Sequence, residues 1–405
     1  MTYCYCCVKS FCTTVSWSNA NYIWTKFDQE TVMLINAISA SSFFYLAFVL
    51  LVKGRSTNRL ANRWLATFVI FVGFLQLDDA LIISRTYFQY PHFYNVFDPF
   101  IFGIAPAFYW ATFHFVQPSR RFYGQSLWHF IPCYLILLLS IPAFLDSKAE
   151  KLALLKVLEE RGQVLGPVEI VVFALIFVQC VVYIVLSYRQ ILWHQQNLKR
   201  VSSSQEDTDL RWFIYFLNGV AILLLFWVIE IGFYTNFLDG KMSWIYWLGT
   251  FYLGFYAIQQ KEIYPFDPQE LAEIAAIIQE KPVINSTPSV IDEAQKEQLL
   301  HLMESEKPYL DPELSLPKLA QLMHCSTHEL SHLINQGFDR NFYQFINTYR
   351  IEESKRLLSD PKLGHLTILA IGFEAGFNSK TTFNTTFKQL VGMSPVEFRG
   401  RKPMA

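Results

Sequence analysis

Charged side chains are scarce in this sequence, and their scarcity excludes several classes of protein. Only 17% of the 405 residues are charged and 52% are hydrophobic, whereas ordinary soluble domains carry roughly 25% charged residues. So apolar a composition excludes an intrinsically disordered chain. Neither sign of charge is in excess, because 33 Lys and Arg face 34 Asp and Glu. No overall field draws the whole chain to nucleic acid, so any such affinity must be local.

Cysteine, glycine and proline are also few. Seven cysteines are too few for a disulfide scaffold, and 17 glycines and 17 prolines exclude collagenous or low-complexity architecture. Four of the cysteines crowd into the opening residues MTYCYCCVKSFC. This pattern lacks the histidines and spaced pairs of a zinc site, so no metal is predicted. We treat residues 1–30 as a separate segment and expect translation to start at Met33 rather than Met1.

Long apolar runs are abundant between residues 31 and 260. Seven of them approach the roughly 20 residues that a helix needs to cross roughly 30 Å of hydrocarbon. The runs cover residues 31–53, 64–84, 94–116, 127–145, 167–187, 211–235 and 243–259. Their length and uniform apolarity favour membrane helices over a large soluble helical core. The sequence thus predicts an all-α protein in which residues 31–260 form a seven-helix transmembrane bundle in a lipid bilayer.

The basic residues of the loops predict the orientation of this bundle, because Lys and Arg are retained on the cytoplasmic side. They concentrate in alternate loops: Lys53, Arg55, Arg59, Arg63, Arg120, Arg121, Arg189, Lys199, Arg200 and Arg211. The opposite loops are poorer, although residues 146–161 mix both signs of charge. We therefore expect the N-terminus outside and, after seven spans, everything beyond Lys261 in the cytoplasm.

The cytoplasmic part changes character. Residues 261–290 combine an amphipathic helix pattern, FDPQELAEIAAIIQEKP, with the turn-rich connector INSTPSV. Residues 291–402 contain several helical patterns without strand alternation, a glycine-rich phosphate loop, a nucleophile elbow or a spaced Cys/His set. We therefore predict no enzyme activity and no cofactor.

Two segments of this region each combine a helix, a sharp turn and a second helix. Ser326 and Glu329 have the spacing of a capping box, and Ser379 is placed to cap the corresponding helix of the second segment. We expect buried stripes of Leu330, Leu333 and Ile334 in the first segment and of Phe383, Phe387 and Leu390 in the second. The residues expected to face DNA are Thr327, His328, Ser331, His332, Ser379, Lys380, Thr381, Asn384, Thr385 and Lys388.

The segment AIGFEAGFNSKTTFNTTFKQLVGMSPVEFR resembles the DNA-binding domain of the AraC/XylS family of bacterial transcription regulators. The matching residues are Gly376, Phe377, Ser379, Phe383, Phe387, Lys388, Gly392, Ser394, Pro395, Phe398 and Arg399. Tyr349, Arg350, Leu357 and Leu358 are similar to the family's linker helix. The resemblance implies two helix-turn-helix units joined by a long helix over residues 291–402. It also implies a double-stranded DNA partner whose successive major grooves, roughly 34 Å apart, receive the two recognition helices.

Four positions depart from the family pattern. Ser354 and Gly372 stand where alanine is usual, and the glycine is expected to cost roughly 1 kcal/mol of helix stability. Thr385 and His332 stand where many members place arginine, so a weaker grip on the DNA backbone is expected.

Local charge nevertheless favours DNA contact at the second unit. Residues 340–405 contain ten basic residues against five acidic ones, whereas residues 290–339 are acidic. We expect the second unit to supply most of the phosphate affinity. The alternative is a charged surface used for contact with protein.

Carboxylates within the apolar runs are candidates for signal sensing, because charges are costly in a membrane. The four candidates lie at similar depth near the outer ends of their spans: Asp78, Asp79, Asp98 and Glu230. We expect them to form, with nearby aromatic residues, a pocket for an unknown small molecule that is cationic or polyhydroxylated. Interfacial carboxylates beside an ordinary aromatic belt are the alternative.

The order of the parts resembles bacterial regulators in which a seven-span sensor in the inner (plasma) membrane is fused to an AraC-type domain. This predicts a membrane-tethered, one-component transcription regulator that could act as a homodimer. A ligand in the bundle would shift the seventh span and the helix near Phe266. The alternative is a seven-span receptor or transporter whose C-terminal domain docks a protein rather than DNA.

Overall fold

The computed structural model confirms an all-α chain. It describes residues 22–53, 58–117, 124–161, 167–203, 210–233, 242–259 and 293–400. Within these ranges every regular element is helical, and the only extended pairing is one isolated bridge. The cysteine-rich start and the connector at 261–290 lie outside these ranges. Met33 lies within the described residues, and the start of translation there stays a prediction.

The chain divides into two compact units. The bundle unit comprises Met1–Ile191 and Leu210–Glu262, and the C-terminal unit comprises Leu192–Asp209 and Ile263–Ala405. The sequence-based division placed residues 192–203 with the bundle, whereas the structure groups them with the C-terminal unit.

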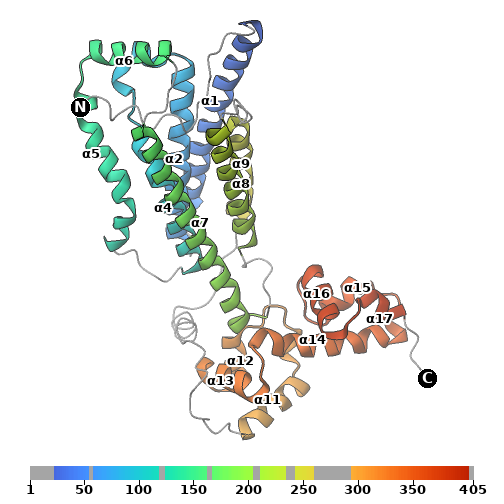
Figure 1. The fold of residues 1–405 in the computed structure, drawn as a ribbon. Coiled ribbons are helices and arrows are strands. Elements are labelled where there is room, and N and C mark those ends of the chain that lie inside the picture. The colour runs from blue at the N-terminus through green and yellow to red at the C-terminus, as the bar shows by residue number, and fades with distance from the viewer. Residues whose placement is uncertain are drawn as a thin grey trace. The chain divides into compact units, whose positions relative to one another are not determined.

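The bundle unit has a helix at each of the seven predicted apolar runs (Figure 1). These helices are α1 (Tyr22–Lys53), α2 (Arg59–Ile83), α4 (Ile101–Val116), α5 (Ile131–Leu145), α7 (Pro167–Val201), α8 (Arg211–Phe233) and α9 (Met242–Gln259). Helix α1 packs along α2 and α9, and α2 packs along α4. Phenylalanine rings join the elements, as where Phe68 of α2 meets Phe108 of α4 with ring centroids 5.1 Å apart.

Five stretches of the described residues are long and apolar enough to cross a membrane. They are Gln29–Val52, Arg59–Ile83, Pro91–Val116, Ser126–Leu145 and Ile170–Val201. Helix α8 contributes a shorter apolar stretch, Arg211–Phe226, and α9 has several tyrosines and glycines among its 18 residues. Only 17% of the apolar window is buried in the fourth stretch, and the same holds for the fifth. Large apolar side chains such as Leu138 and Val178 therefore lie on the surface of the unit.

Short elements connect the long helices of the bundle unit. They are α3 (Thr86–Gln89), η3 (Pro91–Phe93), η4 (Asp98–Phe100), η5 (Gly124–Phe130) and α6 (Lys148–Arg161). Helix α6 packs on η3, and Leu155 joins Tyr87 and Tyr94 in a small apolar cluster.

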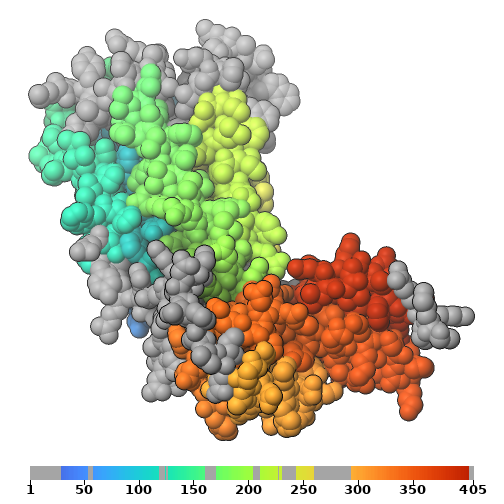
Figure 2. Space-filling model, turned by 60° about the horizontal axis from the view of Figure 1, so that its bottom comes forward, coloured from blue at the N-terminus to red at the C-terminus, as the bar shows by residue number. Residues whose placement is uncertain are grey.

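The C-terminal unit is arranged around one long helix, α14 (Phe342–Ser359). Before it come α11 (Glu293–Ser305), η6 (Pro308–Leu310), α12 (Leu316–Leu322) and α13 (Thr327–Phe338). After it come η7 (Pro361–Leu363), α15 (Ile368–Glu374), α16 (Lys380–Val391) and α17 (Pro395–Gly400). Helix α14 contacts α13 on one side and α15, α16 and α17 on the other. In the space-filling view the elements before α14 are light orange to orange and those after it are red (Figure 2).

Candidate nucleic-acid interface

The first helix-turn-helix unit consists of α12 and α13. Ser315 caps α12 by accepting a hydrogen bond from Lys318 N at 3.4 Å. The turn passes through His324, whose φ of 53° is left-handed. Ser326 then begins α13 with the predicted capping box: its N–H and hydroxyl both donate to Glu329 Oε2 at 2.9 Å, and Glu329 N donates back to Ser326 Oγ at 3.2 Å. The start of the first recognition helix is thus fixed as expected.

The open face of α13 is narrower than expected. The predicted stripe of Leu330, Leu333 and Ile334 is buried. Thr327 and Ser331 are buried as well, at 4% and 9% exposed, because the first turns of α13 pack against α12. Of the four residues predicted on this helix, only the exposed His328 and the half-buried His332 remain at the surface, where Glu329, Asn335 and Gln336 are exposed as well.

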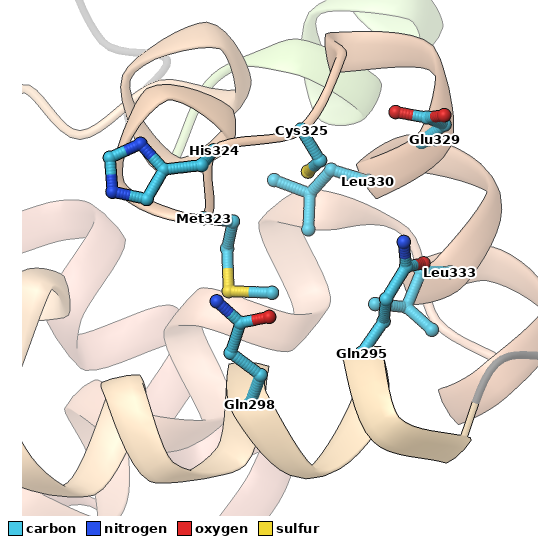
Figure 3. Close-up of a pocket in the computed structure, with 8 residues that line it drawn as sticks. All are labelled: Gln295, Gln298, Met323, His324, Cys325, Glu329, Leu330 and Leu333. Carbon is cyan, nitrogen blue, oxygen red and sulfur yellow. The ribbon is translucent and has the colours of Figure 1, made fainter.

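A cavity of about 230 Å³ lies between α11 and the first unit, where sequence reasoning expected none (Figure 3). Its lining is Gln295, Gln298, Met323, His324, Cys325, Glu329, Leu330 and Leu333. Gln298 and Met323 point toward each other across it (Figure 3). Among the described residues no group of three His, Cys, Asp or Glu side chains could hold a metal ion, so this lining does not make a metal centre. Its glutamines come from α11, a helix that the sequence pattern did not connect with the turn.

The second unit consists of α15 and α16. Thr367 caps α15 by accepting from Ala370 N at 3.1 Å, and Ser379 caps α16 by accepting from Thr382 N at 3.2 Å. Gly376 lies in the turn in a left-handed conformation, with φ +90°. A Cβ at Gly376 would come within 2.3 Å of Tyr309 O, so the approach of η6 also requires glycine. Ser379, expected to face DNA, is only 3% exposed and caps the helix instead.

The buried side of α16 differs from the expectation at one position. Phe383 and Phe387 are fully buried with Ile351 and Ile371 in the core of this unit. Leu390 is 51% exposed, so its predicted place in the stripe is wrong. The helix ends at Val391, and Val391 packs against the core instead.

Gly372 has a packing role that the sequence pattern did not reveal. A Cβ at this position would lie 2.7 Å from Phe383 Cδ1 and 2.9 Å from Cγ. Real Cβ atoms do not approach that closely, so the glycine allows α15 to lie against the phenylalanine. The expected loss of helix propensity is therefore offset by close packing between the two helices.

The opposite side of α16 is open. Lys380, Thr381, Thr385 and Lys388 are exposed, and Asn384 is half-buried. A shallow groove of about 510 Å³ is lined by Asn384, Thr385, Lys388 and Gln389. All five residues predicted on this helix therefore lie together on one polar face.

The structure reduces the number of positive charges available near this face. Among the ten basic residues, Arg350 is buried, and Lys355 and Arg356 pair with Glu352 and Glu353 at 2.7 Å. Arg399 donates to the carbonyl oxygens of Leu366, Leu363 and Gly364 at 2.5–3.2 Å. Arg401 and Lys402 lie outside the described residues. The exposed lysines of the part that the structure describes after residue 356 are Lys362, Lys380 and Lys388, two of them on α16.

The linker helix is joined to both units by Arg350. Its Nε donates to Tyr309 O and its Nη2 to Asp311 O, each at 2.7 Å. Its guanidinium lies 5.8 Å from the Phe377 ring centroid in the turn of the second unit. Burial lowers the pKa of Arg350 to about 10. The other linker departure, Ser354, is buried and donates to Arg350 O at 2.8 Å.

In the bundle unit, three of the predicted sensing carboxylates are buried. Asp78, Asp79 and Asp98 are each 5–6% exposed. Tyr87 Oη donates a hydrogen bond to Asp78 Oδ1. Burial first, and then the charges of Asp78 and Asp98, raise the pKa of Tyr87. Glu230 belongs to α8, but its side chain lies outside the described residues.

Two capped helix-turn-helix units on one linker helix define a DNA-binding domain of the helix-turn-helix class. Residues 319–401 match the family described as "Helix-turn-helix domain". The C-terminal region is therefore a helix-turn-helix domain of the AraC type, and the resemblance predicted from the sequence is confirmed for it.

The similar proteins match only part of this chain. An uncharacterized HTH-type transcriptional regulator of Staphylococcus aureus (strain COL) is 29% identical over 119 residues, which are 29% of this chain and 15% of that protein. The arabinose operon regulatory protein of Salmonella typhimurium is 32% identical over 89 residues, 22% of this chain and 31% of that protein. The chain thus matches under a third of the length of these relatives. No solved structure matches it significantly.

Proposed function

We propose that this protein is a membrane-tethered, one-component transcription regulator that binds specific DNA sequences through its two helix-turn-helix units. The observation that carries the proposal is the pair of capped recognition helices on α14, in a chain that also has five stretches apolar enough to cross a membrane. The names of the similar proteins support transcription regulation. The exposed apolar side chains of α5 and α7 support a lipid environment.

The two recognition helices would contribute differently to DNA binding. His328, His332 and Asn335 would read base edges in one major groove. Asn384 and Thr385 would read the other groove, while Lys380 and Lys388 contact phosphates. Thr327, Ser331 and Ser379 would act indirectly, by holding the helices that present these side chains.

The input would come from the membrane-embedded bundle. We place the N-terminus outside and the DNA-binding domain in the cytoplasm, on the basic residues of the alternate loops. Asp78, Asp79, Asp98 and Glu230 remain the proposed contacts for a small ligand, supported for the first three by their burial and for Asp78 also by the hydrogen bond from Tyr87. Amide replacements, Asp98→Asn with Glu230→Gln, should abolish the response of target genes to the inducing condition. An unchanged response would contradict the proposed pocket.

The function is tested by crosslinking the tagged full-length protein to DNA in its native cell and sequencing the bound fragments. The test variant is Lys380→Ala with Lys388→Ala. The matched control is Lys355→Ala with Arg356→Ala, which removes the same charge from side chains paired with glutamates on α14. We expect discrete sites with the wild type and the control, and none with the test variant.

The rival function makes the opposite prediction. A receptor or transporter that docks a protein through its C-terminal domain would yield no DNA enrichment above the Lys380/Lys388 variant. Homodimerisation on DNA would show as two copies of the two-groove site in each sequenced fragment, whereas a monomer gives one copy.

A further inference from the structure

The end of α7 is a packed part of the C-terminal unit. The helix begins at Pro167, but residues from Leu192 onward have their contacts in the C-terminal unit. His194, Leu198 and Val201 are 0–2% exposed and follow one another at helical spacing. Gln196 and Lys199, on the same turns, are exposed. The end of α7 therefore has one buried face and one solvent face.

Backbone pairing continues the contact beyond the helix. Ser202 forms an isolated antiparallel bridge with Ser315, the residue that caps α12. Ser203 N donates to Leu314 O at 3.4 Å, and Ser203 Oγ donates to the same oxygen at 2.6 Å. The chain leaving α7 is thus attached at the point where the first helix-turn-helix unit begins.

Ser203 also supplies acceptors to the buried Arg350. Arg350 Nη1 donates to Ser203 O at 3.2 Å, and Nη2 donates to Ser203 Oγ at 3.0 Å. Hydrogen bonds from a charged donor are stronger than neutral ones, and a buried donor that loses its acceptor is costly. Without Ser203, the remaining acceptor of Nη1 would be Asn347 Oδ1 at 3.5 Å. The end of α7 therefore completes the environment of this arginine.

Arg350 connects the docked segment to both units. It holds Tyr309 O and Asp311 O in the segment before α12, and it lies against Phe377 in the turn of the second unit. A shift of Ser203 would change the hydrogen bonds of Arg350. Through this side chain it would affect both the segment before α12 and the turn of the second unit.

We infer that the end of α7 is a docking element which, through Ser203 and Arg350, holds the two helix-turn-helix units in the arrangement that binds two major grooves. The inference rests on the proposed DNA-binding function and adds how the bundle would control it. Release of the docked segment lowers DNA affinity. Since α7 begins among the bundle helices, a ligand-driven change there reaches the DNA-binding units by this route, without the connector at 261–290.

The first test compares two serine-to-alanine variants of the full-length protein in lipid nanodiscs. Ser203→Ala removes the docked hydroxyl. Ser187→Ala is the matched control, because Ser187 lies on the same helix and its buried hydroxyl has no hydrogen-bond partner among the described residues. We expect Ser203→Ala to speed amide hydrogen exchange of residues 308–316 about tenfold and to weaken binding to a crosslinking-identified site about tenfold. Ser187→Ala should change neither.

A reversible disulfide between the end of α7 and the start of α12 distinguishes a loss of docking from a general loss of structure. Antiparallel bridge partners have a Cα spacing that suits a disulfide, so Ser202→Cys with Ser315→Cys can hold the segment in place. Adding this pair to Ser203→Ala should restore slow exchange and DNA affinity under oxidising conditions and lose both on reduction. The reduced form carries the same substitutions, including the loss of the cap at Ser315, and lacks only the disulfide. It is therefore the control for the oxidised form. Ser203→Ala alone with and without reductant controls for the natural cysteines.

The outcomes distinguish the two proposals. Unchanged exchange and affinity in Ser203→Ala overturn the docking inference, as does a disulfide that restores neither. If the wild type itself binds no DNA, the proposed function fails, while the exchange of residues 308–316 still decides whether Ser203 holds the segment.

Discussion

The two recognition helices of this protein are built alike but expose different chemistry. Both begin at a serine cap, and both bury one stripe of apolar side chains. Helix α13 exposes an imidazole, a carboxylate and two amides, whereas α16 exposes two lysines, two threonines, an amide and a leucine. Because phosphate contacts supply affinity and base contacts supply specificity, the second helix is the better source of affinity.

The turns differ as well. The first turn uses His324 in a left-handed conformation, so a side chain is accommodated there. The second uses Gly376, where η6 and Arg350 approach the backbone too closely for any Cβ. The second unit is therefore fixed more tightly to the rest of the domain than the first, and substitutions at its turn should cost more.

The largest effect is expected from Gly376→Ala. A Cβ would meet Tyr309 O at 2.3 Å and Leu310 Cα at 2.9 Å, and φ is +90°. We expect a loss of about 3 kcal/mol or more in unfolding free energy of the C-terminal unit, measured by hydrogen exchange in the full-length protein. Gly392→Ala is the control, because Gly392 has φ +79° and no described atom lies within 4 Å of the added Cβ. It should cost only about 1 kcal/mol; equal losses would show that the close approach is unimportant.

The next largest effect is expected from removing a proposed base contact, that of Asn384. Asn384→Ala should weaken binding to the cognate site by about 1–3 kcal/mol and leave random DNA unaffected, because an amide can pair with a base edge. Lys388→Ala should instead weaken both and lower the salt dependence, by about 0.9 in the logarithmic slope. Titration of both variants with cognate and random DNA at several salt concentrations measures the affinities and their salt dependence. If the two variants changed these quantities alike, the division of roles on α16 would be contradicted.

A smaller effect is expected from Gly372→Ala. Alanine favours a helix by about 1 kcal/mol over glycine, but overpacking against Phe383 costs about 1–3 kcal/mol. The net result should be destabilisation, seen as faster hydrogen exchange in α15 and α16. In a Phe383→Leu background part of the clash is removed, so Gly372→Ala should destabilise the unit less there than in the wild type. Stabilisation by Gly372→Ala alone would contradict the packing role.

The smallest effect is expected from removing the serine caps of α13 and α16. For the cap of α13 the loss of stability should depend on pH. The backbone N–H and the hydroxyl of Ser326 lower the pKa of Glu329. A lowered pKa contributes stability above the ordinary value of about 4.3, and this contribution is lost as pH falls through the lowered value. The destabilisation by Ser326→Ala should therefore shrink in acid. Ser379→Ala is the control, because Ser379 caps α16 by accepting from Thr382 N. A pH-independent loss in both variants would contradict the role of Glu329.

Local features were predictable from the sequence. Ser326 and Ser379 cap the helices as expected, because a cap depends only on residues three positions apart. Leu330, Leu333, Phe383 and Phe387 are buried, because helical spacing places them on one face. The resemblance to a known family supplied the pairing of the two units.

Long-range packing was not predictable. Thr327 and Ser331 are polar yet buried, because the neighbouring helix covers them. The contact of Gly372 with Phe383 depends on how two helices cross, and Arg350 meets Ser203 from 147 positions away. The sequence predicted seven apolar runs. Among the described residues, five stretches have the length and apolarity of a membrane span.

The most direct test of the central claim is a footprint of the full-length protein in nanodiscs on a crosslinking-identified site. Two recognition helices in successive major grooves predict two protected segments about 10 base pairs apart. His328→Ala with His332→Ala should remove protection at one segment, and Lys380→Ala with Lys388→Ala should weaken the other first. Loss of both segments to the same extent in both variants, or a single protected segment in the wild type, would contradict the account.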